Sequence, residues 1–476
     1  MDQRKTHMTE AANTEKRRGP LTGVRVLDFS RVLAGPFCSM ILADLGAEVI
    51  KIEEIGVGDQ TRTIPPFVNG ESHYFLAINR NKKSVALDAR TAEGRDILLK
   101  LATNCDVVLE NFRPGVMDRL GLGYERLKAL KPDVIVCSIS GFGAKGSMRD
   151  KPSFDLVTQA LSGVMSINGY PDGAPTKLGL PLGDIGGGLW AAIGVLAALN
   201  ERHASGRGSN IDLSLLEGLM GLLGYLAEIF LVTGENPGRM GNSHHSIVPY
   251  GLIPVKDGHI VLALHVGRFW RNFCGAIGRE DLISNPHYRT VKDRHHNRAE
   301  LERLIGEIMM TRTGAEWQKI LDAADVPHGP VNNIGQALNQ PIIQESGFLR
   351  ETEHPTAGKI KVPGSPLRFR GLYEELRVEP PPLLGEHTRE VLGNLAGLDD
   401  AAVTRLITAG VVATPEQAAT KIRAEELKPS VADGPMALEI DPGEVLDTLL
   451  GRDEGEGAGL IATGGPADSA GVSTKN

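Results

Sequence analysis

Asp184 stands just before a run of glycines and is the residue whose type and setting most clearly suggest chemistry. The segment 177–200 reads KLGLPLGDIGGGLWAAIGVLAALN. A carboxylate at the start of a helix is held ionised by the helix dipole and can act as a nucleophile. Glycines let a bulky substrate approach the backbone, and free N–H groups could stabilise an oxyanion. We therefore predict Asp184, Gly186 and Gly187 as catalytic residues, and an N-cap role for Asp184 is compatible with this.

Two basic clusters follow strand-like segments and could bind phosphate groups. Their cationic side chains are Arg80, Lys82 and Lys83 in NRNKKS, and Arg113 and Arg119 in ENFRPGVMDRLG. Open α/β sheets bind ligands beyond the carboxyl ends of their strands, and the arginine fork suits phosphate oxygens. A solvated charged surface explains such clusters as well, so both interpretations stay open.

Other motifs with a known chemistry lack the context that they need. GFGAKG at 141–146 matches a dinucleotide-binding pattern, but SMRDKPSFD follows it instead of a helix. We therefore predict a plain strand-to-loop turn there. The histidine pairs are adjacent residues and the four cysteines lie far apart, so neither offers metal-ligand spacing. The sequence predicts no metal site and no tightly bound cofactor.

The elements expected around these residues alternate between strands and helices. Short β-branched runs predict strands at 23–30, 47–53, 84–89, 106–112 and 132–140. Apolar periodicity predicts helices between them, at 36–46 and 93–105. This alternation indicates an α/β fold with a parallel sheet covered by helices.

The chain after Asp184 is expected to be mostly helical before a second domain begins. Helices are predicted over 186–204 and 210–232, and the latter run suits a buried helix better than a membrane span. The predicted organisation is a flexible arm (1–19), a large domain (20–235), a smaller α+β domain with its linker (236–335), a segment that returns to the large domain (336–412), and a mostly disordered C-terminal extension (413–476).

Composition sets limits on the class of protein. The chain has 476 residues, a formal net charge of −8 and 57 glycines, a glycine content above the usual share of about 7%. No basic face or abundance of aromatic residues points to nucleic acid. The first residues contain no apolar stretch typical of a signal peptide, so we predict a cytoplasmic enzyme that contacts neither nucleic acid nor membrane.

Taken together, the motifs resemble the class III CoA-transferases, the family of formyl-CoA:oxalate and carnitine CoA-transferases and of α-methylacyl-CoA racemase. The matching segments, in order, are GVRVLDFSRVLAGPFCSMILADLGAEVIKIE (23–53), GDQTR (58–62), NRNKKSVALD (79–88), ENFRPGVMDRLG (110–121), SFDLVTQALSGVMS (153–166), LGDIGGG (182–188), GRGSNIDLSLLEG (206–218), GNSHHSIVPYG (241–251) and LLGEHTREVL (383–392). The resemblance covers residues 20–412.

The resemblance implies a Rossmann-like, CoA-binding large domain, a small domain, and a homodimer of two interlocked rings. It also places the nucleophile at Asp184, which would attack an acyl-CoA thioester to give a mixed anhydride and CoA thiolate. Further exchange steps would deliver CoA to a carboxylic acid acceptor. Exchange of one thioester for another is nearly isoenergetic, so neither ATP nor metal is needed, but water must be excluded from the anhydride.

Carried over position by position, the resemblance also implies a set of residues that contact CoA. They are Val32, Leu33, Ala34, Leu87, Arg90, Asn111, Phe112, Arg119 and Leu120. Leu33 stands where the formyl-CoA:oxalate enzyme has a glutamine, and Glu54 stands where that enzyme has an arginine. The polar residues Asn242, His244 and Tyr250 are candidates for the substrate side and would suit a dicarboxylate.

Two other functions remain as alternatives at this point. An α-methylacyl-CoA racemase-type epimerase needs a proton acceptor on each face of the α-carbon. The racemase has a histidine at the position of Phe154, and a phenyl ring cannot move a proton. A non-catalytic CoA-binding protein is the other alternative, and the retention of Asp184 beside its glycines argues against it.

Overall fold

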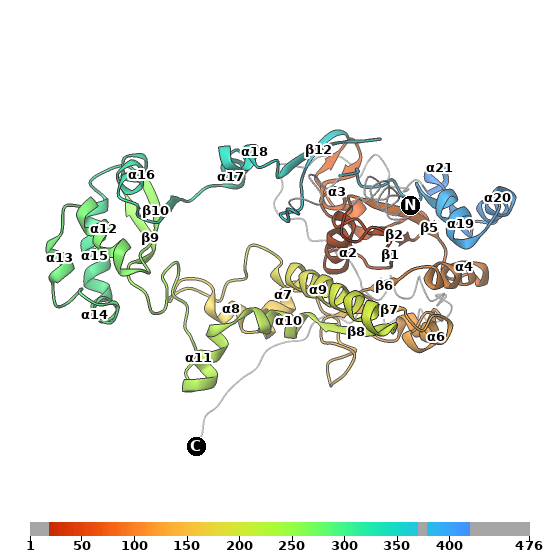
Figure 1. Cartoon of the computed structure of the whole chain (residues 1–476), viewed down its shortest axis with the longest axis horizontal. Coiled ribbons are helices and arrows are strands. Elements are labelled where there is room, and N and C mark those ends of the chain that lie inside the picture. The colour runs from red at the N-terminus through yellow and green to blue at the C-terminus, as the bar shows by residue number, and fades with distance from the viewer. Residues whose placement is uncertain (1–18, 370–377, 419–476) are drawn as a thin grey trace, which may run out of the picture. The chain divides into compact units, whose positions relative to one another are not determined.

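A seven-stranded, mostly parallel sheet runs through the larger part of the fold (Figure 1). We call this sheet and the helices packed on it the large unit. The computed structural model describes residues 19–369 and 378–418. The strands, in their order across the sheet, are β14 (Val412–Ala413), β5 (Lys82–Leu87), β2 (Glu48–Glu53), β1 (Arg25–Asp28), β6 (Val107–Glu110), β7 (Ile135–Ser140) and β8 (Ser209–Ser214). Only the β14–β5 pair is antiparallel, so the predicted parallel α/β sheet is confirmed.

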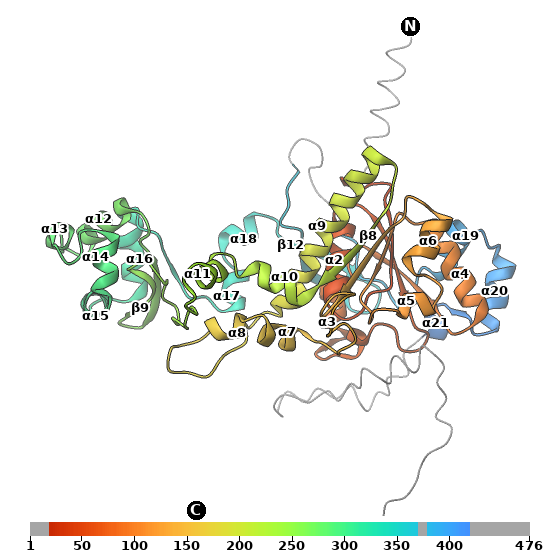
Figure 2. The ribbon, with the colours of Figure 1, turned by 90° about the horizontal axis from the view of Figure 1, so that it is seen from below.

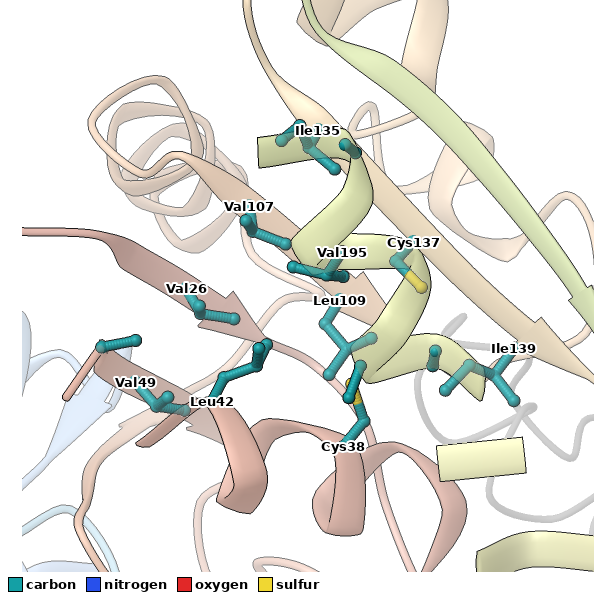
Figure 3. Packing of buried hydrophobic residues seen from close by; sticks show 14 of the residues in the cluster. Val26, Cys38, Leu42, Val49, Val107, Leu109, Ile135, Cys137, Ile139 and Val195 are labelled. Atoms are coloured by element: carbon teal, nitrogen blue, oxygen red, sulfur yellow. The ribbon is translucent and has the colours of Figure 1, made fainter. Parts of the chain in front are cut away.

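Helices cover both faces of this sheet (Figure 2). Helices α2 (Ala34–Asp44) and α9 (Leu182–Ser205) pack together on one face, and α4 (Ala92–Thr103), α6 (Tyr124–Leu130) and α19 (Thr388–Ala396) lie on the other. Figure 3 shows side chains of the core between the sheet and the first pair, including Cys38, Val107 and Val195. Burial on both faces explains why the strands read as continuous apolar runs.

The order of the strands brings several loops to one edge of the sheet. From β1 the chain passes outward to β2 and β5, and it then returns to β6, β7 and β8 on the other side of β1. The carboxyl ends of β1 and β6 therefore flank the point where the winding reverses, which is where open α/β sheets bind ligands. Because α9 leads back into the parallel strand β8, its N-terminus lies at the same carboxyl edge.

The predictions for residues 182–233 need two corrections. Helix α9 begins at Leu182 rather than at 186, with Pro181 as its N-cap residue. The single helix predicted over 210–232 is wrong, because the chain forms β8 and then two helices, α10 (Leu215–Leu222) and α11 (Tyr225–Thr233), which are bent by 82°. Helix α11 contributes no buried residue, so it is not the expected buried helix.

Two segments of the described chain meet a length and composition test for a membrane span. One is α9, of which 44% of the apolar window is buried, and the other is the bent pair α10–α11. The buried part of α9 packs on α2 and the sheet, which is the role of a core helix.

The GFGAKG segment forms a turn as predicted, with the Gly143 N–H donating to Ser140 Oγ and the Ala144 N–H donating to Asp212.

A second hydrophobic core lies between Val248 and Val326. Its antiparallel sheet consists of β9 (Tyr250–Val255), β10 (Gly258–Ala263) and β11 (His328–Pro330). Its helices are α12 (Gly267–Ala276), α13 (Asp281–Ser284), α14 (Val291–His296), α15 (Arg298–Met309) and α16 (Gly314–Ala323). This mixture is the α+β content predicted for the smaller domain, although the exact boundaries at 235 and 335 stay predictions.

The segment after this core returns to the large sheet. Helix α19 packs against α4 and β5, and β14 pairs with β5. The predicted boundary between 412 and 413 cuts through β14, and Ala413 and Ala418 are both buried in a small core cluster. The predicted extension therefore begins later, because main-chain pairing with β5 continues through Ala413. Residues 1–18 of the predicted arm and 419–476 of the extension lie outside the described residues.

Shorter elements complete the described chain. They are η1 (Gln60–Thr63), β3 (Phe67–Val68), β4 (Glu71–Ser72), α3 (His73–Ile78), α5 (Val116–Arg119), α7 (Asp155–Leu161), α8 (Val164–Ile167), α17 (Ile334–Leu338), α18 (Pro341–Glu345), β12 (Leu349–His354), β13 (Gly358–Pro363), α20 (Asp400–Thr408) and α21 (Pro415–Ala418). Of these, α3 and α7 supply side chains to the candidate site described next.

Candidate active site

Asp184 lies in the first turn of α9, at the carboxyl edge of the sheet, and its side chain is half-buried. It does not cap its own helix, because the helix begins two residues earlier. The carboxylate of Asp155, at the start of α7, takes that place. Asp155 Oδ1 accepts the N–H of Gly183 at 2.7 Å and that of Asp184 at 3.4 Å. Sequence reasoning missed Asp155, although it lies in the matched segment SFDLVTQ.

The environment of Asp184 sets the charge of its carboxyl group. Burial, and after it the negative charge of Asp155, raises the pKa of Asp184 to about 7. Burial and the charge of Asp155 thus oppose the ionisation that the helix dipole was expected to favour. A carboxyl group with a pKa near 7 is half ionised at neutral pH and is a more basic nucleophile than an ordinary aspartate.

Gly186, Gly187 and Gly188 are buried inside α9 and serve its packing. A Cβ at Gly187 would lie 2.2 Å from the Leu215 side chain, and one at Gly188 would lie 2.7 Å from the Ala34 carbonyl oxygen. In a helix interior each N–H bonds the carbonyl four residues earlier. The predicted role of Gly186 and Gly187 as oxyanion donors thus loses its premise, since the helix starts before them.

The loop between β1 and α2 is held in place by side chains from three directions. Asn111 accepts the Arg31 N–H and donates to the Arg31 carbonyl, both at 2.8 Å. Asp59 Oδ1 accepts the Val32 N–H at 3.3 Å, and Lys51 Nζ donates to the Ser30 carbonyl at 2.6 Å. Val32 has a φ of 65°, a strained value for a β-branched residue that these bonds maintain.

This loop forms an apolar wall beside the candidate nucleophile together with residues of α2, α3 and α9. The packed residues are Leu33, Met40 and Ile78, with Val32, Phe37, Tyr74 and Ile185 against them. Ile185 follows Asp184 directly, and it packs against the cluster that contains the predicted CoA residue Leu33 and that the predicted CoA residue Val32 also contacts. Burial, followed by the charges of Asp184, Asp59 and Asp155, raises the pKa of Tyr74 to about 12. Tyr74 therefore stays a neutral hydroxyl near the carboxylates, and sequence reasoning did not single it out.

The basic cluster NRNKKS is part of a buried ionic network rather than a phosphate site. Arg80 pairs with Asp44 at 2.6 Å, and Lys82 donates to Asn79 Oδ1 at 2.8 Å and lies 3.6 Å from Asp28. Both side chains are almost fully buried. Lys83 pairs with two glutamates, Glu48 and Glu390, at 2.7 Å each. The phosphate interpretation of this cluster is therefore wrong, because carboxylates and carbonyls already bind its cations.

Most of the remaining predicted CoA residues follow the carboxyl ends of β1, β5 and β6. Leu87 ends β5 and Ala34 begins α2, and both side chains are buried. The Arg31 guanidinium lies over the Phe112 ring, 5.5 Å from its centroid. Arg90 is exposed and bonded to Asp88 at 2.9 Å. The pocket of about 260 Å³ beyond β6 includes Phe112 and Arg113 in its lining.

Arg119 and Leu120 line another pocket, of about 300 Å³, between α4 and the α5–α6 segment. Two further arginines, Arg95 and Arg126, share it, and sequence reasoning missed both. Arg95 Nη1 donates to the Arg90 carbonyl at 2.7 Å, so a residue that lines this pocket contacts the segment after β5. Three guanidinium groups around one pocket are suited to phosphate oxygens.

The predicted substrate-side residues form a separate cluster around the loop 241–251. The His244 ring stacks on Tyr225 and meets Tyr250 edge-on, and Asn242 donates to the Tyr170 hydroxyl at 3.0 Å. His244 also accepts the N–H groups of Ser246 and Ile247 and a guanidinium N–H of Arg298. Among the described residues, the hydrogen bonds and ring contacts given for this cluster do not include Asp184. The residues described in the structure also contain no group of three His, Cys, Asp or Glu side chains suited to a metal ion.

Comparison with known proteins identifies the relatives of this chain. Residues 21–388 match the sequence profile described as CoA-transferase family III. The chain is 40% identical to a succinyl-CoA:glutarate CoA-transferase from Homo sapiens, covering 83% of this chain and 90% of the relative. It is 36% identical to an acetyl-CoA:oxalate CoA-transferase from Acetobacter aceti, covering 78% and 94%. The crystal structure of a CaiB/BaiF family protein from Brucella suis matches with a TM-score of 0.71 at 34% identity, covering 79% and 99%.

Proposed function

The chain belongs to CoA-transferase family III and is an enzyme for CoA transfer between acyl-CoA and carboxylic acids, and we propose that Asp184 is its nucleophile. The observation that carries this proposal is the packing of Ile185, the residue after Asp184, against the apolar cluster that contains Leu33 and against which Val32 also packs. Leu33 and Val32 are two of the residues expected to contact CoA. This shared packing supports a role for the half-buried Asp184 carboxylate near the thioester end of CoA.

The proposed reaction exchanges groups on the Asp184 carboxylate without any redox change. One Asp184 oxygen attacks the carbonyl carbon of the donor thioester, the C–S bond breaks, and CoA leaves as its thiolate. The thiolate then attacks the Asp184 carbonyl of the mixed anhydride and expels the donor acid. An acceptor carboxylate next displaces CoA from the aspartyl thioester, and a last thiolate attack on the acceptor carbonyl restores Asp184 and releases the new acyl-CoA.

The apolar wall fits the main requirement of this sequence, which is the exclusion of water. An acyl-aspartyl anhydride hydrolyses readily, so water near the carboxylate would waste the thioester. Leu33, Phe37 and Ile185 supply apolar surface there, and Leu33 brings no hydrogen-bonding group of its own. The Tyr74 hydroxyl, which stays protonated, is the group we propose as a hydrogen-bond donor to the oxygens of the reacting carbonyl.

We propose a dicarboxylate as the acceptor. The two relatives named above are a succinyl-CoA:glutarate and an acetyl-CoA:oxalate enzyme, so both names contain a dicarboxylate. We propose succinyl-CoA as the donor and a dicarboxylate such as glutarate as the acceptor. Asn242, His244 and Tyr250 remain our proposal for the groups that bind the distal carboxylate.

A substrate panel tests this function. Succinyl-CoA, acetyl-CoA and formyl-CoA are each incubated with mono- and dicarboxylic acids, and new acyl-CoA species are quantified by mass spectrometry. We expect transfer from succinyl-CoA to dicarboxylates, with glutarate above oxalate. Formation of acyl-CoA from monocarboxylates alone would contradict the acceptor class. Incubation in heavy water tests the epimerase alternative, because only proton abstraction would put deuterium on the α-carbon.

Replacing Arg119 with alanine is expected to raise the KM for acyl-CoA about tenfold and to leave kcat unchanged. We propose that the pocket of Arg95, Arg119 and Arg126 binds phosphate groups of CoA. A hydrogen bond between charged groups contributes roughly 1.5–3 kcal/mol, and 1.4 kcal/mol corresponds to a factor of ten in affinity. The matched control is Arg303→Ala, an exposed arginine on α15. An unchanged KM in Arg119→Ala would remove this pocket from the CoA site.

We also propose that the enzyme is a homodimer, with a second copy of the chain covering one apolar face of the large unit. Exposed apolar side chains gather on three consecutive helices, namely Leu189, Trp190 and Ile193 on α9, Met220 and Leu222 on α10, and Tyr225, Phe230, Leu231 and Val232 on α11. Monomeric proteins rarely expose a contiguous apolar surface of this kind. The interlocked arrangement of the dimer is what the family resemblance implies.

The variant Ile193→Asp is expected to shift the enzyme from dimer to monomer. Ile193 is 55% exposed on α9 in the single chain, and a charge buried at a dimer interface without a partner is strongly unfavourable. Leu130→Asp serves as the control, because Leu130 is similarly exposed but lies at the end of α6 on the opposite face. Light scattering coupled to size exclusion measures the mass. A monomeric wild type, or two variants that behave alike, would contradict the proposed interface.

A further inference from the structure

The Asp155 carboxylate is hydrogen-bonded to the first turn of α9, a contact that no sequence pattern indicated. Its Oδ1 accepts the N–H groups of Gly183 and Asp184, and its Oδ2 accepts the Gln159 side-chain amide at 2.6 Å. Asp155 and Gln159 are four residues apart and therefore share one face of α7. One carboxylate thus occupies the free donors of the helix turn that carries the nucleophile.

Gln159 fixes the position of this carboxylate. Its side chain is fully buried, and its Oε1 accepts the Leu178 N–H at 2.9 Å while its Nε2 also donates to the Leu180 carbonyl at 3.3 Å. The loop before α9 and the carboxylate that caps α9 are therefore held by one amide. Because the main chain of Leu178 and Leu180 holds this buried amide in place, Asp155 cannot turn away from α9 without leaving an N–H of Gln159 unsatisfied.

Gly183 explains why this contact is so close. A Cβ at position 183 would lie 2.9 Å from Asp155 Oδ1 and 2.7 Å from Thr158 Oγ1. Only a residue without a side chain lets the carboxylate and α7 approach the backbone at this distance. The glycine before the nucleophile in LGD is thus a requirement of the Asp155 contact rather than of substrate access.

We propose that Asp155 is a positioning residue for the nucleophile: its carboxylate anchors the first turn of α9 and holds a second negative charge next to Asp184. This inference rests on the proposed function, in which Asp184 attacks the thioester. The hydrogen bonds from the N–H groups of residues 183 and 184 fix the backbone from which the Asp184 side chain extends. The negative charge of Asp155 opposes ionisation of the Asp184 carboxyl group. The same neighbour therefore controls both the direction and the basicity of the attacking oxygen.

Asp155 is the charged group that faces Asp184 from the elements packed against the start of α9. The ionisable groups on those elements are Asp155 on α7, Tyr74 and His73 on α3, Cys38 and Asp44 on α2, and Glu217 on α10. Asp44 ends α2 and is paired with Arg80 at 2.6 Å, and His73 is exposed. Burial raises the pKa of Tyr74 to about 12 and that of Cys38 well above its usual value, so both are neutral near pH 7. Glu217 is exposed to solvent. The charge of Asp155 is thus the one that a substitution can remove selectively.

A more basic aspartate favours the productive direction of anhydride cleavage. When CoA thiolate attacks the mixed anhydride, it can expel either Asp184 or the substrate acid. A carboxylate of lower basicity is the better leaving group, and substrate carboxylic acids ionise well below pH 7. Attack at the Asp184 carbonyl therefore expels the substrate acid more readily than attack at the acyl carbonyl expels Asp184. A charge beside Asp184 thus directs the exchange toward the aspartyl thioester.

The test is the pH profile of acyl-enzyme formation in Asp155→Asn. Asparagine keeps an oxygen that can accept the Gly183 N–H but removes the charge. Mixing with succinyl-CoA and quenching, followed by intact-mass measurement, gives the rate of adduct formation between pH 5 and 9. In the wild type we expect the acid limb near pH 7. In Asp155→Asn we expect it to move down by about one pH unit, because removal of a like charge lowers the pKa of Asp184.

Two further variants separate charge from structure. Asp155→Glu keeps the charge and should retain an acid limb near that of the wild type, and the exposed Asp150→Asn serves as the matched control. An Asp155→Asn profile identical to that of the wild type would overturn the inference. If Asp155→Asn does not fold, the wild-type profile decides, because a midpoint near pH 4 would also overturn it. Absence of any adduct in the wild type would instead refute the proposed function.

Discussion

Replacing Asp184 with asparagine is expected to abolish the covalent adduct and to lower CoA transfer at least about a thousandfold. The amide keeps the size and shape of the side chain but has no anionic oxygen to attack a thioester. The helix position is unaffected, because Asp155 bonds the N–H groups of residues 183 and 184 and not the Asp184 side chain. The measurement combines intact-mass analysis after exposure to succinyl-CoA with steady-state transfer rates.

The control for this prediction is Glu201→Gln, which removes an exposed carboxylate from the far end of the same helix. That variant should form the adduct at the wild-type rate. A mass increase that persists in Asp184→Asn would place the nucleophile elsewhere. Retained binding of CoA in Asp184→Asn, measured by calorimetry, would show that the loss concerns the chemistry and not the site as a whole.

Replacing Lys51 with methionine is expected to destabilise the large unit by about 3–5 kcal/mol, the usual cost of leaving one partner of a buried ion pair alone. Lys51 Nζ lies 2.8 Å from Asp59 Oδ2, and both side chains are almost completely inaccessible to solvent. Lys51 also donates to the Ser30 carbonyl, and Asp59 accepts the Val32 N–H. The variant should therefore also raise the KM for acyl-CoA, because both contacts hold the loop beside Asp184.

Lys83→Met is the matched control for this substitution. Lys83 lies on the neighbouring strand β5 and pairs with Glu48 and Glu390, but these side chains are partly exposed. Water screens such pairs, so we expect a loss of at most about 1 kcal/mol. Chemical denaturation at a fixed protein concentration measures both variants. Equal losses of stability in the two would show that burial of the Lys51 pair is not what matters.

The Lys51–Asp59 pair also predicts a dependence of stability on pH. Burial alone would raise the pKa of Asp59, but Lys51 and the donors of Thr61 outweigh it and lower that pKa to about 2. A carboxyl group with a lowered folded-state pKa stabilises the fold above its ordinary value of 3.8. That contribution is present above about pH 4 and disappears as the pH falls toward 2.

The elements of the sheet could be predicted because their pattern is local. Strands β1, β2, β5, β6 and β7 each show a short apolar run between turn residues, and a strand buried on both faces produces that pattern whatever its partners are. Strand β8 was missed because it is an edge strand with only Ser214 buried, and its residues merge into the apolar run of α10. Local pattern cannot separate an edge strand from a helix that follows it directly.

The glycine excess and the basic cluster show where local reasoning misled. Gly187 and Gly188 were read as access for a substrate, whereas they admit Leu215 and the Ala34 carbonyl against α9. For Lys82 the sequence leaves open a phosphate site and a solvated surface, whereas in the structure Lys82 is buried beside Asp28 and Asn79. In both cases the partner is far away in the sequence. A glycine or a lysine has the same appearance in a sequence whether it faces a ligand or the protein interior.

The sequence by itself determined the family, the parallel sheet and the identity of Asp184 as the candidate nucleophile, because these depend on ordered motifs and on local periodicity. Only the tertiary structure decided the setting of that carboxylate. Asp155 is 29 residues from Asp184, and it becomes a neighbour only when α7 packs against the start of α9. The pKa of an acid depends on burial and on nearby charges, and both are properties of packing in space.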